Sequence, residues 1–239
     1  MKLMRLVEIA SLGVLITSLL GFAVTRSARA GVVDTTGNIL FVTPPPNVVL
    51  TTFEDNLNVR LFREQTGLVL PISITLDVTK PGKVDAFSDL TRAKLAQGTH
   101  VDSYLLHADP LGFGIPIRVF EGSVTFNQPI LGAMMTYESL TASDALLGSA
   151  TTNYIPPETF RGFEGPGFRE TGPVVSDSLE ISADFLTLKF SFRTESRMDQ
   201  IRIVTVPNPE PSTAGLAAFA AAFAAFRRRC SRKETGMAV

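Results

Sequence analysis

The chain of 239 residues contains a single cysteine, Cys230, which follows a run of arginines near the carboxyl end. The rest of the chain can therefore form no disulfide and offers no thiol as a nucleophile or a metal ligand. Tryptophan is absent, and the only histidines are His100 and His107. A hydrophobic core has to stabilise the fold, and the apolar share of 45% is ample for one.

Positive charge is scarce between residues 31 and 206, where 13 Lys and Arg face 20 Asp and Glu, a net charge of −7. The remaining basic residues border apolar segments at the two ends of the chain. Nucleic-acid binding needs a clustered basic face, so the acidic centre argues against nucleic acid as a partner. Basic residues beside apolar segments are typical of membrane topology instead.

Residues 1–30 have the three-part layout of a secretory signal peptide. A basic start precedes an uncharged apolar run at residues 9–24, and Ala28-Arg29-Ala30 supplies the small-x-small ending. This layout predicts export through the Sec machinery with cleavage after Ala30. An uncleaved membrane anchor is the less favoured alternative, because the apolar run is short for a membrane span.

Period-two alternation dominates the middle of the chain. The clearest example is residues 186–193, where Leu and Phe alternate with Thr, Lys, Ser and Arg. This pattern predicts a strand with one buried and one solvent-facing side. A similar run at residues 179–182 precedes it, and the Ala183-Asp184 step between them predicts a hairpin. Further strands are expected at residues 59–62, 68–78, 101–106, 117–120, 123–126, 130–136 and 201–205.

Helical signal is scarce. The best candidate is Thr141–Leu147, with Thr141 or Ser143 as the N-cap and Gly148 as the stop. Many short strands and almost no helix predict a mainly β fold over residues 31–205. We expect an antiparallel β-sandwich with jelly-roll-like topology.

Two stretches are expected to be loops. The triple proline at residues 44–46 is stiff and extended, and we expect it to lead into the first strand. Residues 151–172 are rich in glycine and proline and carry Phe160, Phe163 and Phe168. Aromatics on a long loop can contact a sugar or a partner, but we favour their packing beneath the loop.

Candidates for catalysis are weak. Strand alternation places His107 on the face of Ser103 and Leu105, with Asp109 two residues on, but no Gly-x-Ser-x-Gly pattern is present. A catalytic triad and a site of two histidines and a carboxylate remain open alternatives, although a structural histidine is favoured. We expect no catalytic residue, no cofactor and no metal.

Two further patterns carry little chemistry. Glu54 and Asp55, with Asp102 or Asp199, could supply oxygen ligands for Ca²⁺, but no calcium-loop motif is present. The glycine-rich residues 161–167 lack the Gly-Lys-Ser/Thr ending of a phosphate-binding loop, which excludes a nucleotide site of that type.

The carboxyl end has three parts. Residues 206–212 read VPNPEPS and form an exposed polar segment, residues 213–226 are uncharged and apolar, and Arg227, Arg228 and Arg229 follow. As a helix, residues 213–226 would rise about 21 Å, short of the roughly 30 Å hydrocarbon core. The arginines predict a cytoplasmic stop, with residues 234–239 as a short cytoplasmic tail.

This three-part order closely resembles the PEP-CTERM sorting signal, here spanning residues 206–233. The resemblance implies export, recognition by an exosortase, which is a membrane cysteine peptidase that removes the tail, and association with extracellular polysaccharide and biofilm. The motif residues it implies are Val206, Pro207, Pro209, Glu210, Pro211 and Ser212. The central region is loosely similar to exported members of that family that have no assigned activity, in residues 101–107, 122–126, 142–148 and 199–202.

Three hypotheses follow. The first is a non-enzymatic cell-surface or extracellular-matrix protein, sorted by an exosortase, with a structural, adhesive or polysaccharide-associated role. The second is an exported glycan-acting hydrolase that uses two carboxyl groups about 5 to 9.5 Å apart. The third is a bitopic membrane protein that retains its tail.

Overall fold

The computed structural model describes residues 31–112, 118–154, 161–163, 177–194 and 198–208. These residues all belong to one compact unit that ends at Asn208. The predicted signal peptide with Ala28 and Ala30, the apolar tail segment and Arg227–Arg229 lie outside the described residues, as do Pro209, Glu210, Pro211 and Ser212. In the described part of the chain, no helix has the length and apolar character needed to cross a membrane.

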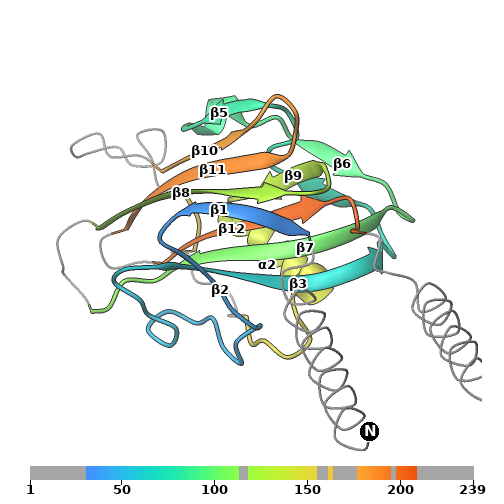
Figure 1. Ribbon diagram of the computed structural model, residues 1–239. Coiled ribbons are helices and arrows are strands. Elements are labelled where there is room, and N and C mark those ends of the chain that lie inside the picture. The colour runs from blue at the N-terminus through green and yellow to red at the C-terminus, as the bar shows by residue number, and fades with distance from the viewer. Residues whose placement is uncertain (1–30, 113–117, 155–160, 164–176, 195–197, 209–239) are drawn as a thin grey trace, which may run out of the picture. The chain divides into compact units, whose positions relative to one another are not determined.

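Two five-stranded sheets form the body of the unit (Figure 1). The first sheet has the spatial order β1 (Val32–Gly37), β8 (Arg118–Phe126), β11 (Thr187–Thr194), β10 (Ser178–Ile181), β5 (Gly82–Val84). The second has the order β2 (Ile39–Phe41), β3 (Val59–Val69), β7 (His100–Ala108), β12 (Asp199–Thr205), β9 (Ile130–Met134). All neighbours are antiparallel except the β2–β3 pair, which confirms the prediction of a mainly β fold with antiparallel sheets.

Four of the described elements lie outside the two large sheets. β4 (Ile74–Leu76) and β6 (Ala93–Leu95) form a two-stranded sheet, and η1 (Phe87–Asp89) is a single 3₁₀ turn. The one α-helix among the described residues is α2 (Tyr137–Leu147).

A hydrophobic core lies between the two five-stranded sheets. The alternating positions of β8 and β11 send Val124, Leu188 and Phe190 into it from one side. β7 and β12 contribute from the other side, with residues such as Leu106 and Ile203. The shared cluster shows that the two sheets pack face to face, as alternation in an antiparallel sheet requires.

The outer face of the second sheet is also covered, because α2 packs on it. Leu105 and Val204 from the sheet join Leu140 and Leu147 of the helix in a second hydrophobic cluster. As a result, all seven residues of β12 are buried. The one-sided burial expected for an antiparallel strand therefore fails for β12.

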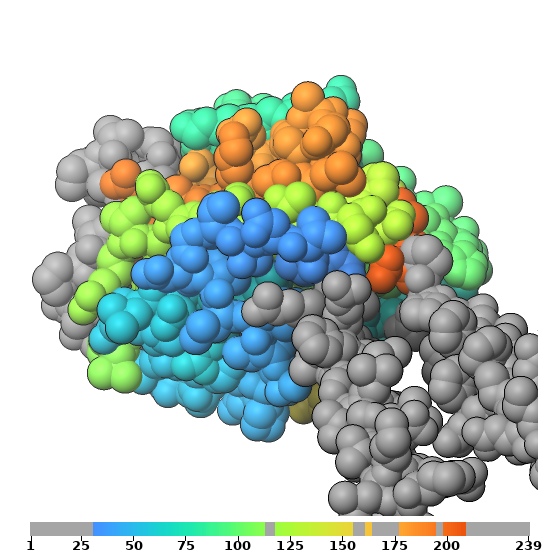
Figure 2. Space-filling view, in the orientation of Figure 1, coloured from blue at the N-terminus to red at the C-terminus, as the bar shows by residue number. Residues whose placement is uncertain are grey.

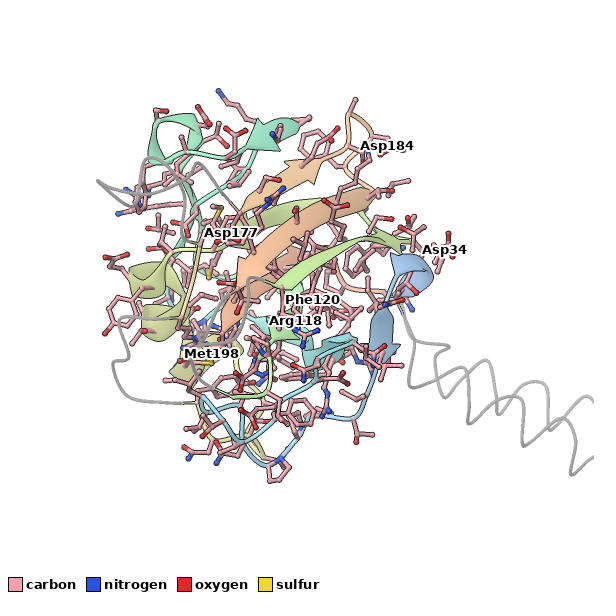
Figure 3. All side chains as sticks on the ribbon, turned by 90° about the vertical axis from the view of Figure 1, so that its left-hand side faces the viewer. Asp34, Arg118, Phe120, Asp177, Asp184 and Met198 are labelled. Atoms are coloured by element: carbon pink, nitrogen blue, oxygen red, sulfur yellow. The ribbon has the colours of Figure 1, made fainter. Side chains whose placement is uncertain are left out.

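The predicted hairpin is present. β10 pairs with β11 so that Leu179 faces Phe190 and Ile181 faces Leu188. The turn carries Asp184, whose Oδ1 accepts hydrogen bonds from the Ser182 hydroxyl at 2.5 Å and the Leu186 backbone N–H at 3.0 Å. Figure 3 shows Asp184 at one end of this hairpin and Asp177 toward the other.

The helix begins four residues earlier than predicted, at Tyr137, and neither Thr141 nor Ser143 is its cap. The N-cap is Thr136, whose Oγ1 accepts the Ser139 N–H at 3.3 Å. The buried carboxylate of Asp77 also accepts the N–H groups of Met135 and Thr136, both at 2.9 Å. The helix ends at Gly148 as predicted, where the Gly148 N–H bonds to the Asp144 carbonyl.

The triple proline does not lead into the first strand, because β1 and β2 precede it. Its carbonyls instead bind the loop after α2: Pro45 O accepts the Thr152 hydroxyl at 2.6 Å and Pro46 O accepts the Asn153 N–H at 2.9 Å. The expected strand at 68–78 is divided, with its start in β3 and its end in β4, and the expected strands at 117–120 and 123–126 are joined in β8.

Candidate functional site

The outer face of the first sheet carries an open groove of about 420 Å³. Figure 2 shows the surface on this side, where β1 (blue), β8 (green) and the β10–β11 hairpin (orange) lie next to one another. The groove is lined by Thr36, Gly37, Lys83, Glu121, Gly122, Ser123, Ser178, Leu179, Glu180, Lys189, Phe190 and Ser191.

Strand alternation explains why this surface is polar. The side chains opposite the core residues of β8 and β11 point outward, and the register places Ser191 beside Glu121 and Lys189 beside Ser123. Gly37 and Gly122 are paired in register at the edge of the groove. A Cβ on Gly37, which has φ +78°, would lie 2.1 Å from the Glu121 carbonyl oxygen, so glycine is needed for the close approach of β1.

The groove side chains hydrogen-bond mainly to one another. The Thr36 and Ser123 hydroxyls are 2.8 Å apart, and Lys189 Nζ lies 3.4 Å from Glu180 Oε2. Two lysines and two glutamates line the groove, so its charge is balanced. Such a surface suits a hydroxyl-rich, uncharged ligand better than a polyanion.

Aromatic platforms are missing from the described lining of the groove. Its one aromatic residue, Phe190, is buried in the core between the sheets. This lining therefore has no exposed aromatic ring on which a sugar could stack. It can bind a sugar through hydrogen bonds to its hydroxyl and charged groups.

The two groove glutamates lie on strands that are not neighbours, and each contacts a residue of the strand between them, Glu121 with Ser191 and Glu180 with Lys189. Glu121 and Glu180 lie on β8 and β10, which are separated by β11, and the register offsets them by two residues. Two strand spacings and two residue rises place their Cα atoms about 12 Å apart. The carboxyl groups of retaining and inverting glycosidases lie about 5 to 9.5 Å apart.

A second polar cluster is buried between the second sheet and α2. Arg202 on β12 is fully buried, and its Nε and Nη2 bind the two carboxylate oxygens of Glu64 at 2.7 and 2.8 Å. Its Nη2 also lies 2.8 Å from Asp144 Oδ1 on the helix. Arg161 binds the same Asp144, with Nη2 2.7 Å from Oδ1. Two guanidinium groups and two carboxylates thus balance one another, and we name Arg202, Glu64, Asp144 and Arg161 the buried quartet.

Burial and neighbouring charges shift the pKa values of Arg202 and of Tyr154, which lies beside the quartet. Burial alone would lower the pKa of Arg202, but the carboxylates of Glu64 and Asp144 raise it above its ordinary value. Burial, together with the charge of Glu64, raises the pKa of Tyr154, whose hydroxyl donates to Glu64 Oε1 at 2.6 Å. Arg202 and Tyr154 therefore stay protonated at physiological pH, which suits a structural clamp on the helix better than acid–base catalysis.

His107 lies at the end of this network, on the face of Ser103 and Leu105 as alternation predicted. Its Nδ1 is 2.8 Å from Nε2 of Gln200, and Gln200 in turn binds Nε of Arg161. Burial, and then the nearby Arg60 and Arg161 charges, lower the pKa of His107 to about 3. The ring is therefore neutral at physiological pH, and its surroundings favour the structural interpretation.

The carboxylates considered for Ca²⁺ do not gather. Asp55 accepts the N–H groups of Leu57 and Asn58 at 2.9 and 3.0 Å, while Asp102 accepts the Gly67 N–H at 2.7 Å. Across the described ranges, no three His, Cys, Asp or Glu side chains come together in a way that could hold a metal ion.

Part of the glycine-rich stretch is described. Arg161 belongs to the buried quartet, and Phe163 packs edge-on against Phe192 with ring centroids 5.9 Å apart. The expectation that the loop aromatics pack inward is therefore met for Phe163. Phe160 and Phe168 lie outside the described residues.

Two residues of the predicted sorting motif, Val206 and Pro207, are described. Both are half-buried, as is Asn208, so this part of the motif is not the fully exposed segment that was expected. The Val206 N–H donates to the Pro129 carbonyl at 2.9 Å.

Comparison with protein-family models, curated proteins and solved structures gives no match. The site therefore has to be interpreted from its own geometry. Sequence reasoning missed both the groove and the quartet. The groove depends on the register of strands that are distant in sequence, and Arg202 has the local pattern of a solvent-facing strand residue.

Proposed function

We propose that this protein is an exported, non-enzymatic component of the cell surface or extracellular matrix that associates with polysaccharide through the groove of the first sheet. The structural observation that carries this proposal is the lining of the groove. Hydroxyls from Thr36, Ser123 and Ser191 lie among two lysines and two glutamates, whose charges balance. This surface offers donors and acceptors to sugar hydroxyl groups along its length.

The sequence of the carboxyl-terminal tail supports the proposed localisation outside the cell. The order of polar segment, apolar segment and arginines resembles a PEP-CTERM signal, which makes an exosortase and the Sec machinery the proposed partners. The apolar segment would insert in the inner membrane until the peptidase removes it. We further propose a jelly-roll-like sandwich, supported by the chain's repeated passage between the two sheets from β7 to β12.

The two alternatives have less support. A glycan hydrolase would need a carboxylate pair at catalytic separation, whereas the carboxylates of Glu180 and Glu121 are engaged by Lys189 and Ser191. A bitopic protein would retain the apolar segment, which is short for a stable span.

Retention on polysaccharide tests the groove directly. We would pass the exported protein over exopolysaccharide extracted from the producing cells, with crosslinked dextran as a neutral reference. We expect Ser123→Arg and Ser191→Arg to reduce retention at least tenfold, because each adds a long charged side chain to the lining of the groove. Thr75→Arg, at an exposed strand position on β4 outside the groove, serves as the matched control. Equal retention of all variants, or no retention of the wild type, contradicts the proposal.

A further inference from the structure

Gly31, which precedes β1, and Asn208, which follows β12, are both hydrogen-bonded to Asn127. The backbone N–H of Asn127, in the turn between β8 and β9, donates to the Gly31 carbonyl at 2.9 Å. The side-chain amide of the same Asn127 donates to the Asn208 side-chain oxygen at 2.8 Å. Asn127 therefore binds the chain just before β1 and just after β12 to a single turn.

A buried carboxylate holds Asn208 from the other side. Asp102, at the start of β7, is fully buried, and its Oδ2 accepts the Asn208 N–H at 3.1 Å. Its Oδ1 accepts the Gly67 N–H at 2.7 Å. Burying a carboxylate without hydrogen-bond donors costs free energy. The hydrogen bond from Asn208 therefore stabilises the buried Asp102 and at the same time holds Asn208 in place.

Every backbone donor between the end of β12 and Asn208 is used. Val206 N–H donates to the Pro129 carbonyl, Pro207 has no N–H, and Asn208 N–H donates to Asp102. The chain is thus hydrogen-bonded to the sandwich up to the residue immediately before Pro209.

We propose that Asp102 and Asn127 form an end anchor that holds residues 206–208 on the sandwich and so protects them from removal with the sorting tail. The anchor makes Val206, Pro207 and Asn208 part of the domain, although the first two belong to the sorting motif by sequence. A peptidase needs an extended, unpaired segment, so the anchor restricts tail removal to positions after Asn208. This inference rests on the proposed tail processing and adds to it the residues that define its boundary.

Amide hydrogen exchange, read by mass spectrometry on the full chain in detergent micelles, tests the anchor. We expect the Asn208 amide to exchange at least tenfold more slowly than an unstructured amide. Asp102→Asn turns one acceptor oxygen into an amide donor, and we expect it to speed Asn208 exchange at least tenfold. Asn127→Ala removes the side-chain donor from an exposed position and is expected to act in the same direction without endangering the fold. The exposed Asp34→Asn and the neighbouring Gln128→Ala are the matched controls.

Two results overturn the anchor: an Asn208 amide that exchanges at the unstructured rate in the wild type, or variants that leave its exchange unchanged. Ile203, in the centre of β12, reports global unfolding, so local release and loss of the fold are separable. The measurement uses the uncleaved chain and requires no processing. A cell-surface form of full length would contradict the proposed tail removal instead, so the two failures are distinguishable.

Discussion

Arg202 and Glu64 form a fully buried, two-point ion pair between β12 and β3, with both side chains at 0% exposure. Their partners extend the contact to the helix, since Arg202 also binds Asp144, which Arg161 shares. The pair therefore joins three segments that are distant in the chain: two neighbours of the central strand β7, and the helix that covers them.

Removing one member of this pair should be strongly destabilising. Arg202→Met leaves the Glu64 carboxylate buried without its main counter-charge, and we expect a loss of about 3–5 kcal/mol in the free energy of unfolding. Urea titration measures it. In the double variant Glu64→Leu, Arg202→Met, the free energy of unfolding should decrease by less than the sum of the decreases in the two single variants. The reason is that the double variant leaves neither charge unpaired. Lys189→Met, which breaks the exposed ion pair with Glu180, should remain close to the wild type. Strict additivity would contradict this account of the quartet.

His107 should make the fold sensitive to acid. Its pKa is about 3 in the folded state, against the ordinary 6.5. Well above pH 6.5 the ring is neutral in both states and contributes no pH dependence. As the pH falls from 6.5 toward 3, only the unfolded chain takes up the proton, so stability decreases. Between pH 7 and pH 5, the titration of His107 alone should lower the free energy of unfolding by about 2 kcal/mol.

His107→Gln isolates this effect, because it keeps an acceptor for Gln200 and removes the titrating ring. We would measure the free energy of unfolding by urea titration at pH 7 and at pH 5. Between these pH values the wild type should lose about 2 kcal/mol more of this free energy than the variant. Identical losses would mean that the ring is protonated as readily in the folded state as in the unfolded chain.

Asp77 should control where the helix starts. Its carboxylate accepts the N–H groups of Met135 and Thr136 and the Ser139 hydroxyl, and its charge lies at the positive end of the helix dipole. We expect Asp77→Asn to lower the free energy of unfolding by about 1.5–3 kcal/mol. Faster amide exchange at Tyr137 and Glu138 should accompany this loss. Asp34→Asn, which removes an exposed charge, is the control, and an equal effect of both variants would refute a specific cap.

Gly31 should tolerate no side chain. Its φ is +103°, and a Cβ there would lie 2.0 Å from the Tyr104 hydroxyl oxygen. We expect Gly31→Ala to lower the free energy of unfolding by about 1–3 kcal/mol through crowding, in addition to the effect of backbone strain. In a Tyr104→Phe background the clash with the hydroxyl is absent, so the cost of Gly31→Ala should fall. A double-mutant cycle measures this coupling, and a coupling energy of zero contradicts the close contact.

Local sequence pattern was sufficient for the elements whose burial is one-sided. Residues 186–193 alternate because one face of β11 meets the core and the other faces the groove. The Gly148 stop is equally local. These features could be predicted because the neighbours that determine them are close in sequence or implied by period two.

The second sheet was predictable only in part, because a helix covers its outer face. Gln200 and Arg202 alternate with Ile201 and Ile203 as solvent-facing residues would, yet all four are buried. Their partners come from β3, β7 and α2, which no local pattern reveals. The start of α2 was missed for the same reason, since Asp77 is 58 residues from Met135.

The functional features likewise differ in whether the local sequence reveals them. The tail resemblance depends on the order of neighbouring residues and is visible in the sequence. The groove depends on the pairing of β1, β8, β10 and β11, and the anchor depends on Asp102 and Asn127 reaching Asn208 across more than eighty residues of chain.

The intact mass of the protein recovered from the outer surface of the producing cells tests the central claim most directly. We expect a chain that begins at Gly31 and ends after Asn208, without the apolar segment of residues 213–226. A surface form that still carries that segment and the arginines after it, or a chain that remains in the inner membrane at full length, would contradict export followed by tail removal.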